Sequence, residues 1–72
     1  MDNINLYFGN NLRKFREEKH LTQEEFAEKC NISSAYYGRL ERGEHSISLD
    51  LCKNIADYLG IHISALFLDL PI

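Results

Sequence analysis

The sequence has few basic residues for its length. Its 72 residues include 8 Lys and Arg against 11 Asp and Glu, which gives a net charge of −3 at pH 7. Proteins that bind nucleic acids usually carry a basic surface, because neutralising phosphates supplies most of their non-specific affinity. The basic residues are concentrated in two segments, residues 13–19 and 39–42, so a local basic face stays compatible with the acidic total.

Long apolar runs are also absent. No apolar run approaches the roughly 20 residues that a membrane-spanning helix requires. No charged start precedes an apolar stretch, as it would in a signal peptide. Hydrophobic residues make up 44% of the chain and charged residues 26%, which is typical of a soluble globular protein. We therefore expect a cytoplasmic protein that has no contact with a membrane.

Cysteine is scarce, and its placement indicates neither a disulfide nor a metal site. Cys30 and Cys52 each lie among apolar neighbours at helical spacing, so we interpret them as small core residues. The histidines and cysteines show none of the short spacings typical of zinc ligands. No nucleophile occurs together with a base and an orienting group. We therefore expect no metal, no cofactor, no small-molecule ligand and no catalytic residues.

Apolar residues recur at the spacing of α-helices, and the alternation typical of strands does not persist. Phe8, Leu12 and Phe15 are four and three residues apart, which indicates a first helix. Thr22 followed by Glu25 forms a capping box, which predicts the start of a second helix. The pattern predicts an all-α fold, a compact domain of five helices. The domain spans residues 1–72, and its predicted helices cover residues 5–19, 22–30, 33–42, 48–59 and 63–68.

The predicted helix ends carry residues that tolerate a left-handed backbone. Gly43 lacks a Cβ, and His20 and Asn31 tolerate positive φ better than most residues do. Asn31 falls between two short helices, where a steep crossing within a few residues makes a helix-turn-helix. Ala27 is small enough to let the next helix approach closely. The expected caps of the third and fourth helices are Ser33 or Ser34, and Ser48. The expected inner residues of the fourth helix are Leu49, Cys52, Ile55, Ala56 and Leu59.

Three short motifs in this segment, "LTQEEFA", "RLERG" and "IADYLGI", are more specific than helical periodicity. From Gly9 to Phe67 the sequence resembles the Xre family of helix-turn-helix regulators, which includes the DNA-binding domains of phage Cro and repressor proteins. Within that family, "ERGEHSISL" is most similar to the small controller proteins of restriction–modification systems. The resemblance implies a lambda-repressor-like fold that binds double-stranded DNA. It also implies regulation of transcription by a homodimer on a palindromic operator.

The resemblance implies roles for individual residues as well. Gln23 matches a glutamine that contacts a DNA phosphate and can brace the recognition helix, and Arg42 matches a frequent phosphate contact. Arg16 and Glu41 match a pair that forms an internal salt bridge between the first and third helices. The positions that match the groove-facing or backbone-facing residues of the third helix are Ser33, Ser34, Ala35, Tyr36 and Arg39.

The third helix departs from the family pattern at two places. Ser34 and Ala35 are short where many relatives carry Gln, Arg or Lys, so direct base contact would depend mainly on Arg39 bonding to a guanine. The alternative for Arg39 is a phosphate contact or a solvated side chain. Gly38 costs about 1 kcal/mol relative to alanine inside a helix. Either DNA comes very close to Gly38, or it is an exposed position without a role.

The chain has more apolar residues than a domain of this size easily buries. Leu51 and Tyr58 lie beside the core stripe of the fourth helix, and Ile63, Leu68 and Leu70 follow in the C-terminal segment. These residues either close the domain's own core or form the dimer interface that the resemblance implies. A second interpretation of the whole chain, favoured by its acidic balance, is a helical protein-interaction or antitoxin-like module with weak or no DNA binding.

Overall fold

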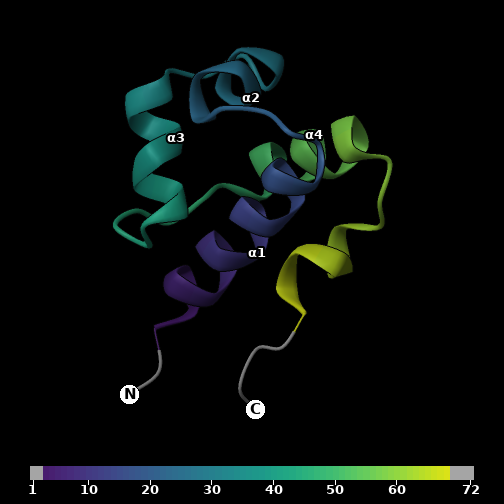
Figure 1. The fold of residues 1–72 in the computed structure, drawn as a ribbon. Coiled ribbons are helices and arrows are strands. Elements are labelled where there is room, and N and C mark those ends of the chain that lie inside the picture. Colours follow the sequence, from purple (N-terminus) through teal and green to yellow (C-terminus); the bar gives the residue numbers. More distant parts are fainter. Residues whose placement is uncertain (1–2, 69–72) are drawn as a thin grey trace.

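The computed structural model describes residues 3–68 and consists of four α-helices and a short 3₁₀ helix, η1 (Figure 1). The helices are α1 Ile4–Glu18, α2 Gln23–Lys29, α3 Ser34–Glu41, α4 Leu49–Leu59 and η1 Ile63–Phe67. The all-α fold is therefore as predicted, except that the fifth helix is a single 3₁₀ segment rather than an α-helix. In the described part of the chain, no helix has the length and apolar character needed to cross a membrane.

The helices are arranged around α1, which runs through the middle of the molecule (Figure 1). Helix α3 packs against α1 on one side and η1 packs against it on the other, whereas α2 packs against α3 and α4 packs against η1. Asn11 links α1 to the C-terminal 3₁₀ helix, because its side-chain amide donates to the carbonyls of Leu66 at 3.0 Å and Leu68 at 2.8 Å. The outer side of the α2–α3 helix pair carries the exposed residues Ser34, Ala35 and Arg39.

The local signals at the helix starts appear as predicted. The Thr22 hydroxyl accepts from the Glu25 amide at 3.1 Å, and the Glu25 carboxylate accepts from the Thr22 amide at 2.8 Å, which completes the capping box. Ser33, rather than Ser34, caps α3, and Ser48 caps α4. These caps satisfy amides that would otherwise lack partners at the helix ends.

The helix ends agree with the sequence as well. His20 and Asn31 adopt left-handed φ angles of 58° and 60°, and no other described residue except glycine has a positive φ. Gly43 follows α3 with a φ of 73°, and Gly60 follows α4 with a φ of 69°. The three turns that orient α2, α3 and α4 therefore depend on residues that tolerate this conformation.

The core lies where the helices meet. Of the expected inner residues of α4, Leu59 is half-buried at the edge of the core and Leu49 is missing from it. Leu49, expected at the inner face of α4, is 79% exposed. It is the first residue of that helix, and because Cβ atoms tilt toward a helix N-terminus, its side chain extends past the end of the core. Cys30 and Cys52 are free thiols, the first half-buried and the second buried. The buried apolar residues are Phe8, Leu12, Phe26, Ala27, Tyr37, Leu40, Cys52, Ile55, Ala56 and Leu66.

Candidate nucleic-acid interface

The α2–α3 pair is fixed to the core through one side of each helix. At the turn, Asn31 takes its left-handed conformation and the Ile32 amide donates back to the Ala27 carbonyl at 3.0 Å. Across the pair, the rings of Phe26 and Tyr37 have centroids 5.1 Å apart. Since the buried residues of α3 occupy this inner side, its other side faces solvent. A helix held in this way can enter a DNA groove without first being ordered.

A buried ion pair joins α1 to α3 behind the exposed side. Arg16 Nε lies 2.6 Å from Glu41 Oε2, and the two side chains are only 13% and 3% exposed. Arg16 also donates to the carbonyl of Leu21 at 2.7 Å, and Gln23 Nε2 donates to Glu41 Oε1 at 2.9 Å. The structure thus brings together the two residues that the resemblance paired, and adds Gln23 to them.

This network controls the ionisation of Glu41. Burial raises the pKa of the carboxyl, but its interactions with Arg16, Tyr37 and Gln23 together lower it more, so the pKa of Glu41 lies below its ordinary value. The bond to Glu41 correspondingly raises the pKa of Arg16. The pair is therefore charged at neutral pH, and it fixes the angle between α1 and α3 more surely than it adds stability.

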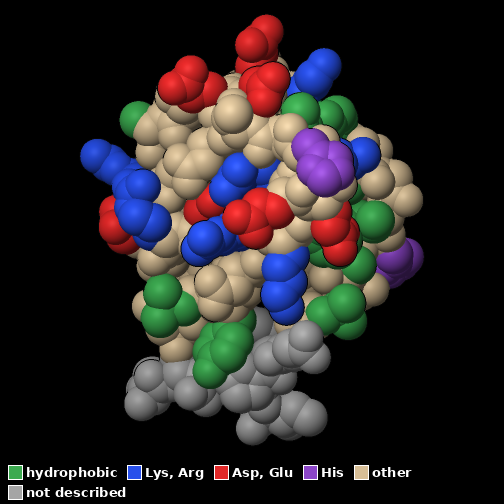
Figure 2. Space-filling model, viewed as in Figure 1, with side chains coloured by type: hydrophobic (Ala, Val, Ile, Leu, Met, Phe, Trp, Pro, Cys, Tyr) green, Lys and Arg blue, Asp and Glu red, His purple; other side chains and the backbone are tan. Residues whose placement is uncertain are grey.

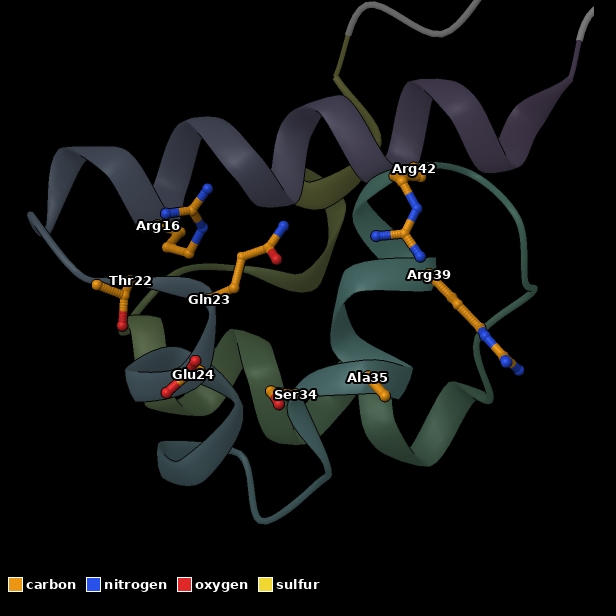
Figure 3. Close-up of a pocket in the computed structure, with 8 residues that line it drawn as sticks. All are labelled: Arg16, Thr22, Gln23, Glu24, Ser34, Ala35, Arg39 and Arg42. Carbon is orange, nitrogen blue, oxygen red and sulfur yellow. The ribbon is translucent and has the colours of Figure 1, made fainter.

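A shallow depression of about 660 Å³ lies on the exposed side of the helix pair (Figure 3). Gln23 extends between Arg16 and Arg42, and Arg39 points away from the other side chains (Figure 3). Five of the seven proposed DNA-contacting residues line this depression, whereas Ser33 and Tyr36 do not. Its lining comprises Arg16, Thr22, Gln23, Glu24, Ser34, Ala35, Arg39 and Arg42.

The two remaining residues lie at its margins. Ser33 uses its hydroxyl to accept from the Tyr36 amide at 3.1 Å, so its side chain already has an internal role. The half-buried Tyr36 ring meets the ring of His45 edge to face, with centroids 5.3 Å apart. His45 comes from the loop after α3, and sequence reasoning did not select it. A contact between a helix and the loop that follows it leaves no periodic signal in the sequence.

Gly38 has a role that neither sequence interpretation described. It is buried rather than exposed, and a Cβ built on it would lie 2.9 Å from Arg42 Nη1 and 3.5 Å from Gln23 Oε1. The close approach at Gly38 is therefore made by side chains of the protein itself. The missing Cβ lets the Arg42 guanidinium lie across α3.

Arg42 is also paired with an acidic residue, Glu44, that sequence reasoning missed. Arg42 Nε donates to Glu44 Oε2 at 2.9 Å, and its Nη2 donates to Glu44 Oε1 at 3.3 Å. This bond raises the pKa of Arg42 and lowers that of Glu44. A spacing of two residues is not a helical pairing distance. Only the reversal of the chain at Gly43 brings the two side chains together.

Charge on this side of the molecule is mixed rather than uniformly basic (Figure 2). Acidic side chains gather at the top of the view, where Figure 1 places α2, and basic and acidic side chains alternate across the middle. Of the three arginines in the depression, Arg16 and Arg42 are paired with carboxylates. Arg39 forms no ion pair within residues 3–68. It is therefore the arginine most available to a ligand.

The residues expected at a dimer interface are divided between core and surface. Tyr58 is half-buried, and its ring meets Phe26 edge to face at 5.5 Å, so it mainly serves the domain itself. Leu51 and Ile63 are half-buried, whereas Leu68 is 57% exposed. Leu70 lies outside the described residues. Three further exposed apolar side chains that sequence reasoning did not assign to an interface are Ile4, Leu6 and Leu49.

The described residues also bear on metal binding. Within residues 3–68, no cluster of three or more His, Cys, Asp or Glu side chains could hold a metal ion. Burial raises the pKa of the Cys30 thiol to about 11. A thiol with this pKa is a poor nucleophile and a poor metal ligand at neutral pH.

Two helices joined by a tight turn, the second exposed along one side, define a helix-turn-helix protein. A family model described as helix-turn-helix matches residues 12–66 of the chain. The chain belongs to this family, in the Xre-like branch whose members include DNA-binding transcriptional regulators. Phage repressors and controller proteins are both among its relatives.

The chain is similar to controller proteins over most of its length. Control protein C.MunI from a Mycoplasma species is 41% identical over 71 residues, covering 97% of this chain and 96% of that protein. Control protein C.BamHI from Bacillus amyloliquefaciens is 36% identical over 61 residues, covering 83% and 75%. The crystal structure of the restriction-modification controller protein C.AhdI from Aeromonas hydrophila is 35% identical, with a TM-score of 0.82. That match covers 88% of this chain and 96% of the solved one.

Proposed function

We propose that this protein binds a specific sequence of double-stranded DNA and regulates transcription from it. The observation that carries the proposal is the exposed side of α3, where Ser34, Ala35 and Arg39 lie next to Gln23 and Arg42 in one depression. All five offer hydrogen bonds, charge or a small apolar contact, the groups that meet bases and phosphates. The relatives include a control protein and a repressor, which supports a regulatory role rather than a catalytic one. We propose a cytoplasmic location, where such a protein would meet DNA.

Within this face we assign different tasks to the residues. Arg39, which has no ion pair in residues 3–68, reads a base, and a bidentate bond to guanine is the contact that it makes best. Gln23 and Arg42 contact phosphates, while Ser34 and Ala35 make close but weakly selective contacts in the groove. Ser33 and Tyr36 lie at the edge, where Tyr36 can reach the DNA backbone. Because only Arg39 is assigned a selective base contact, each domain would make few base contacts.

We further propose that the protein acts as a homodimer on a palindromic operator. Two recognition helices about 34 Å apart would enter successive major grooves and double the few contacts of one domain. Exposed apolar side chains support a dimer, since a contiguous apolar patch usually marks an interface. Among the residues first expected there that lie within 3–68, Leu68 is the most exposed, and Leu49 is a further exposed apolar side chain. Leu51 and Ile63 would border this contact, whereas Tyr58 contributes less because Phe26 covers its ring.

The test is selection from a pool of random duplexes, followed by sequencing of the bound fraction. We expect enrichment of one inverted repeat whose half-sites lie about one helical turn apart. Binding to the enriched duplex should fall steeply as salt rises, because phosphate contacts release counterions. If no sequence is enriched and no duplex binds even at low salt, the alternative of a protein-interaction module replaces this proposal.

A further inference from the structure

The Arg42–Glu44 pair has the geometry by which an arginine binds a phosphate. Two guanidinium nitrogens of Arg42 donate to the two oxygens of one carboxylate, at 2.9 and 3.3 Å. Arginine recognises carboxylate and phosphate with this same planar fork. Glu44 therefore occupies one edge of the Arg42 guanidinium, formed by Nε and Nη2, that could otherwise bind a DNA phosphate.

The surrounding backbone keeps this pair on the DNA-facing side. Gly38 leaves the space in which the Arg42 guanidinium lies, beside the Gln23 amide. The left-handed turn at Gly43 places Glu44 against the same guanidinium. Arg42 lines the depression together with Arg39, so the paired guanidinium lies on the face proposed for DNA.

We propose that Glu44 limits the affinity of the protein for DNA by acting as an internal substitute for a phosphate on Arg42. This inference rests on the proposed function. On binding, the Arg42 guanidinium exchanges the Glu44 carboxylate for a phosphate oxygen, and the carboxylate turns to solvent. No bond is made or broken covalently in this exchange. Its effect is to reduce the gain that the phosphate contact would otherwise give.

The exposure of the pair makes such an exchange feasible. The side chains of Arg42 and Glu44 are 54% and 53% exposed, in contrast with the buried pair of Arg16 and Glu41. An exposed ion pair contributes little stability, so it can open without disturbing the fold. The buried Arg16–Glu41 pair holds α1 against α3, whereas in the exposed Arg42–Glu44 pair a ligand can take the place of Glu44.

The experiment compares Glu44→Gln with wild type in binding to the duplex that selection enriches. We expect Glu44→Gln to bind about two- to fivefold more tightly at low salt, since exposed ion pairs are worth that much. The control is Glu24→Gln, which also removes a negative charge, in this case from the lining of the depression. Unlike Glu44, Glu24 forms no ion pair with an arginine within residues 3–68. Any gain in Glu24→Gln measures general repulsion between the protein and DNA.

A double-mutant cycle separates the two effects. If Glu44 acts through Arg42, Glu44→Gln must give little or no gain in an Arg42→Ala background, whereas the Glu24→Gln effect should persist there. An equal gain in both backgrounds would overturn the inference, and so would unchanged binding by Glu44→Gln when wild type binds the duplex. If wild type binds no duplex at all, the proposed function itself fails.

Discussion

At the scale of single residues, the three arginines of the depression differ in how they are held. Arg16 is buried in a network with Glu41, and Arg42 is paired at the surface with Glu44. Arg39 extends from the last turn of α3 without an ion pair in the described residues (Figure 3). Arg16 thus has a structural role, whereas we propose that Arg42 exchanges Glu44 for a phosphate and that Arg39 reads a base.

Arg39→Ala tests the reading task. We expect this variant to lose discrimination at one base position in each half-site, worth about 1–3 kcal/mol, because a bidentate contact to guanine is removed. The measurement is repeated duplex selection with the variant. Arg13→Ala is the matched control, since Arg13 pairs with Glu17 on α1 and does not line the depression. Loss of affinity without any change in the selected sequence would assign Arg39 to a phosphate instead.

The Glu41 carboxyl gives a pH dependence that can be measured at the same scale. Its pKa is lowered in the folded protein, so its stabilising effect is present at neutral pH and is lost as pH falls below its ordinary value of 4.5. We expect the free energy of unfolding, measured with denaturant, to fall between pH 6 and pH 3.

Two variants separate Glu41 from other carboxylates. Glu41→Gln should already be destabilised at pH 7, and it should show a smaller further loss on acidification, because its ion pair is gone at every pH. Glu44→Gln should keep most of the wild-type acid loss, because its pair is exposed. The same acid loss in Glu41→Gln as in wild type would show that this carboxyl does not control the pH dependence.

At the scale of helices, two glycines determine how closely neighbouring groups approach. Gly9 of α1 is buried against α3, and a Cβ there would lie 2.4 Å from the Glu41 carbonyl oxygen and 2.5 Å from that of Leu40. Backbone carbonyls cannot move aside as a flexible side chain can. At Gly38 the nearest group is instead the end of Arg42. Substitution by alanine should therefore lower the stability of the protein at Gly9 but raise it at Gly38.

Gly9→Ala should destabilise the protein by about 1–3 kcal/mol, because α1 and α3 must separate. Gly38→Ala should raise stability by up to about 1 kcal/mol through helix propensity, while weakening DNA binding because Arg42 is displaced. Denaturant unfolding and titration with the selected duplex measure the two effects. Equal destabilisation by both variants would mean that Arg42 cannot move away from Gly38.

The helices also show which features the sequence could predict. Helix caps such as Thr22 and turn residues such as Asn31 depend on neighbours within a few positions, so their patterns were sufficient. The exposure of Leu49 and the burial of Gly38 depend on which element lies opposite, and periodicity cannot supply that. The pairing of Arg42 with Glu44 depends on the turn between them. The Arg16–Glu41 pair was predicted through the family resemblance, whereas the Arg42–Glu44 pair and the Tyr36–His45 contact were not.

At the scale of the whole molecule, an acidic protein has mixed charge on the face proposed for DNA and leaves apolar residues exposed elsewhere (Figure 2). We propose that dimerisation compensates for the few contacts of each domain. Leu49 provides a clean test, because at 79% exposure it adds little to the domain's own core. It lines a small apolar groove together with Ile4, Phe8 and Phe67.

Leu49→Glu should shift the protein toward monomer in sedimentation experiments and weaken operator binding, because a charge replaces apolar contact area. Leu49→Met, which keeps the apolar character, should remain dimeric. Thermal unfolding of Leu49→Met should stay close to wild type, whereas the Tm of Leu49→Glu should no longer rise with protein concentration, because assembly stabilises the folded state. A dimer unaffected by Leu49→Glu would place the interface elsewhere on the molecule.

The most direct test of the central claim is to map the DNA-binding face by NMR. Backbone amide shifts of the 72-residue protein would be followed as the selected duplex is added. We predict that the largest shifts occur at Gln23 and across residues 33–44, with smaller ones at the proposed dimer contact. Largest shifts on α4 and η1, or no shifts at all, would contradict the assignment of α3 as the recognition helix.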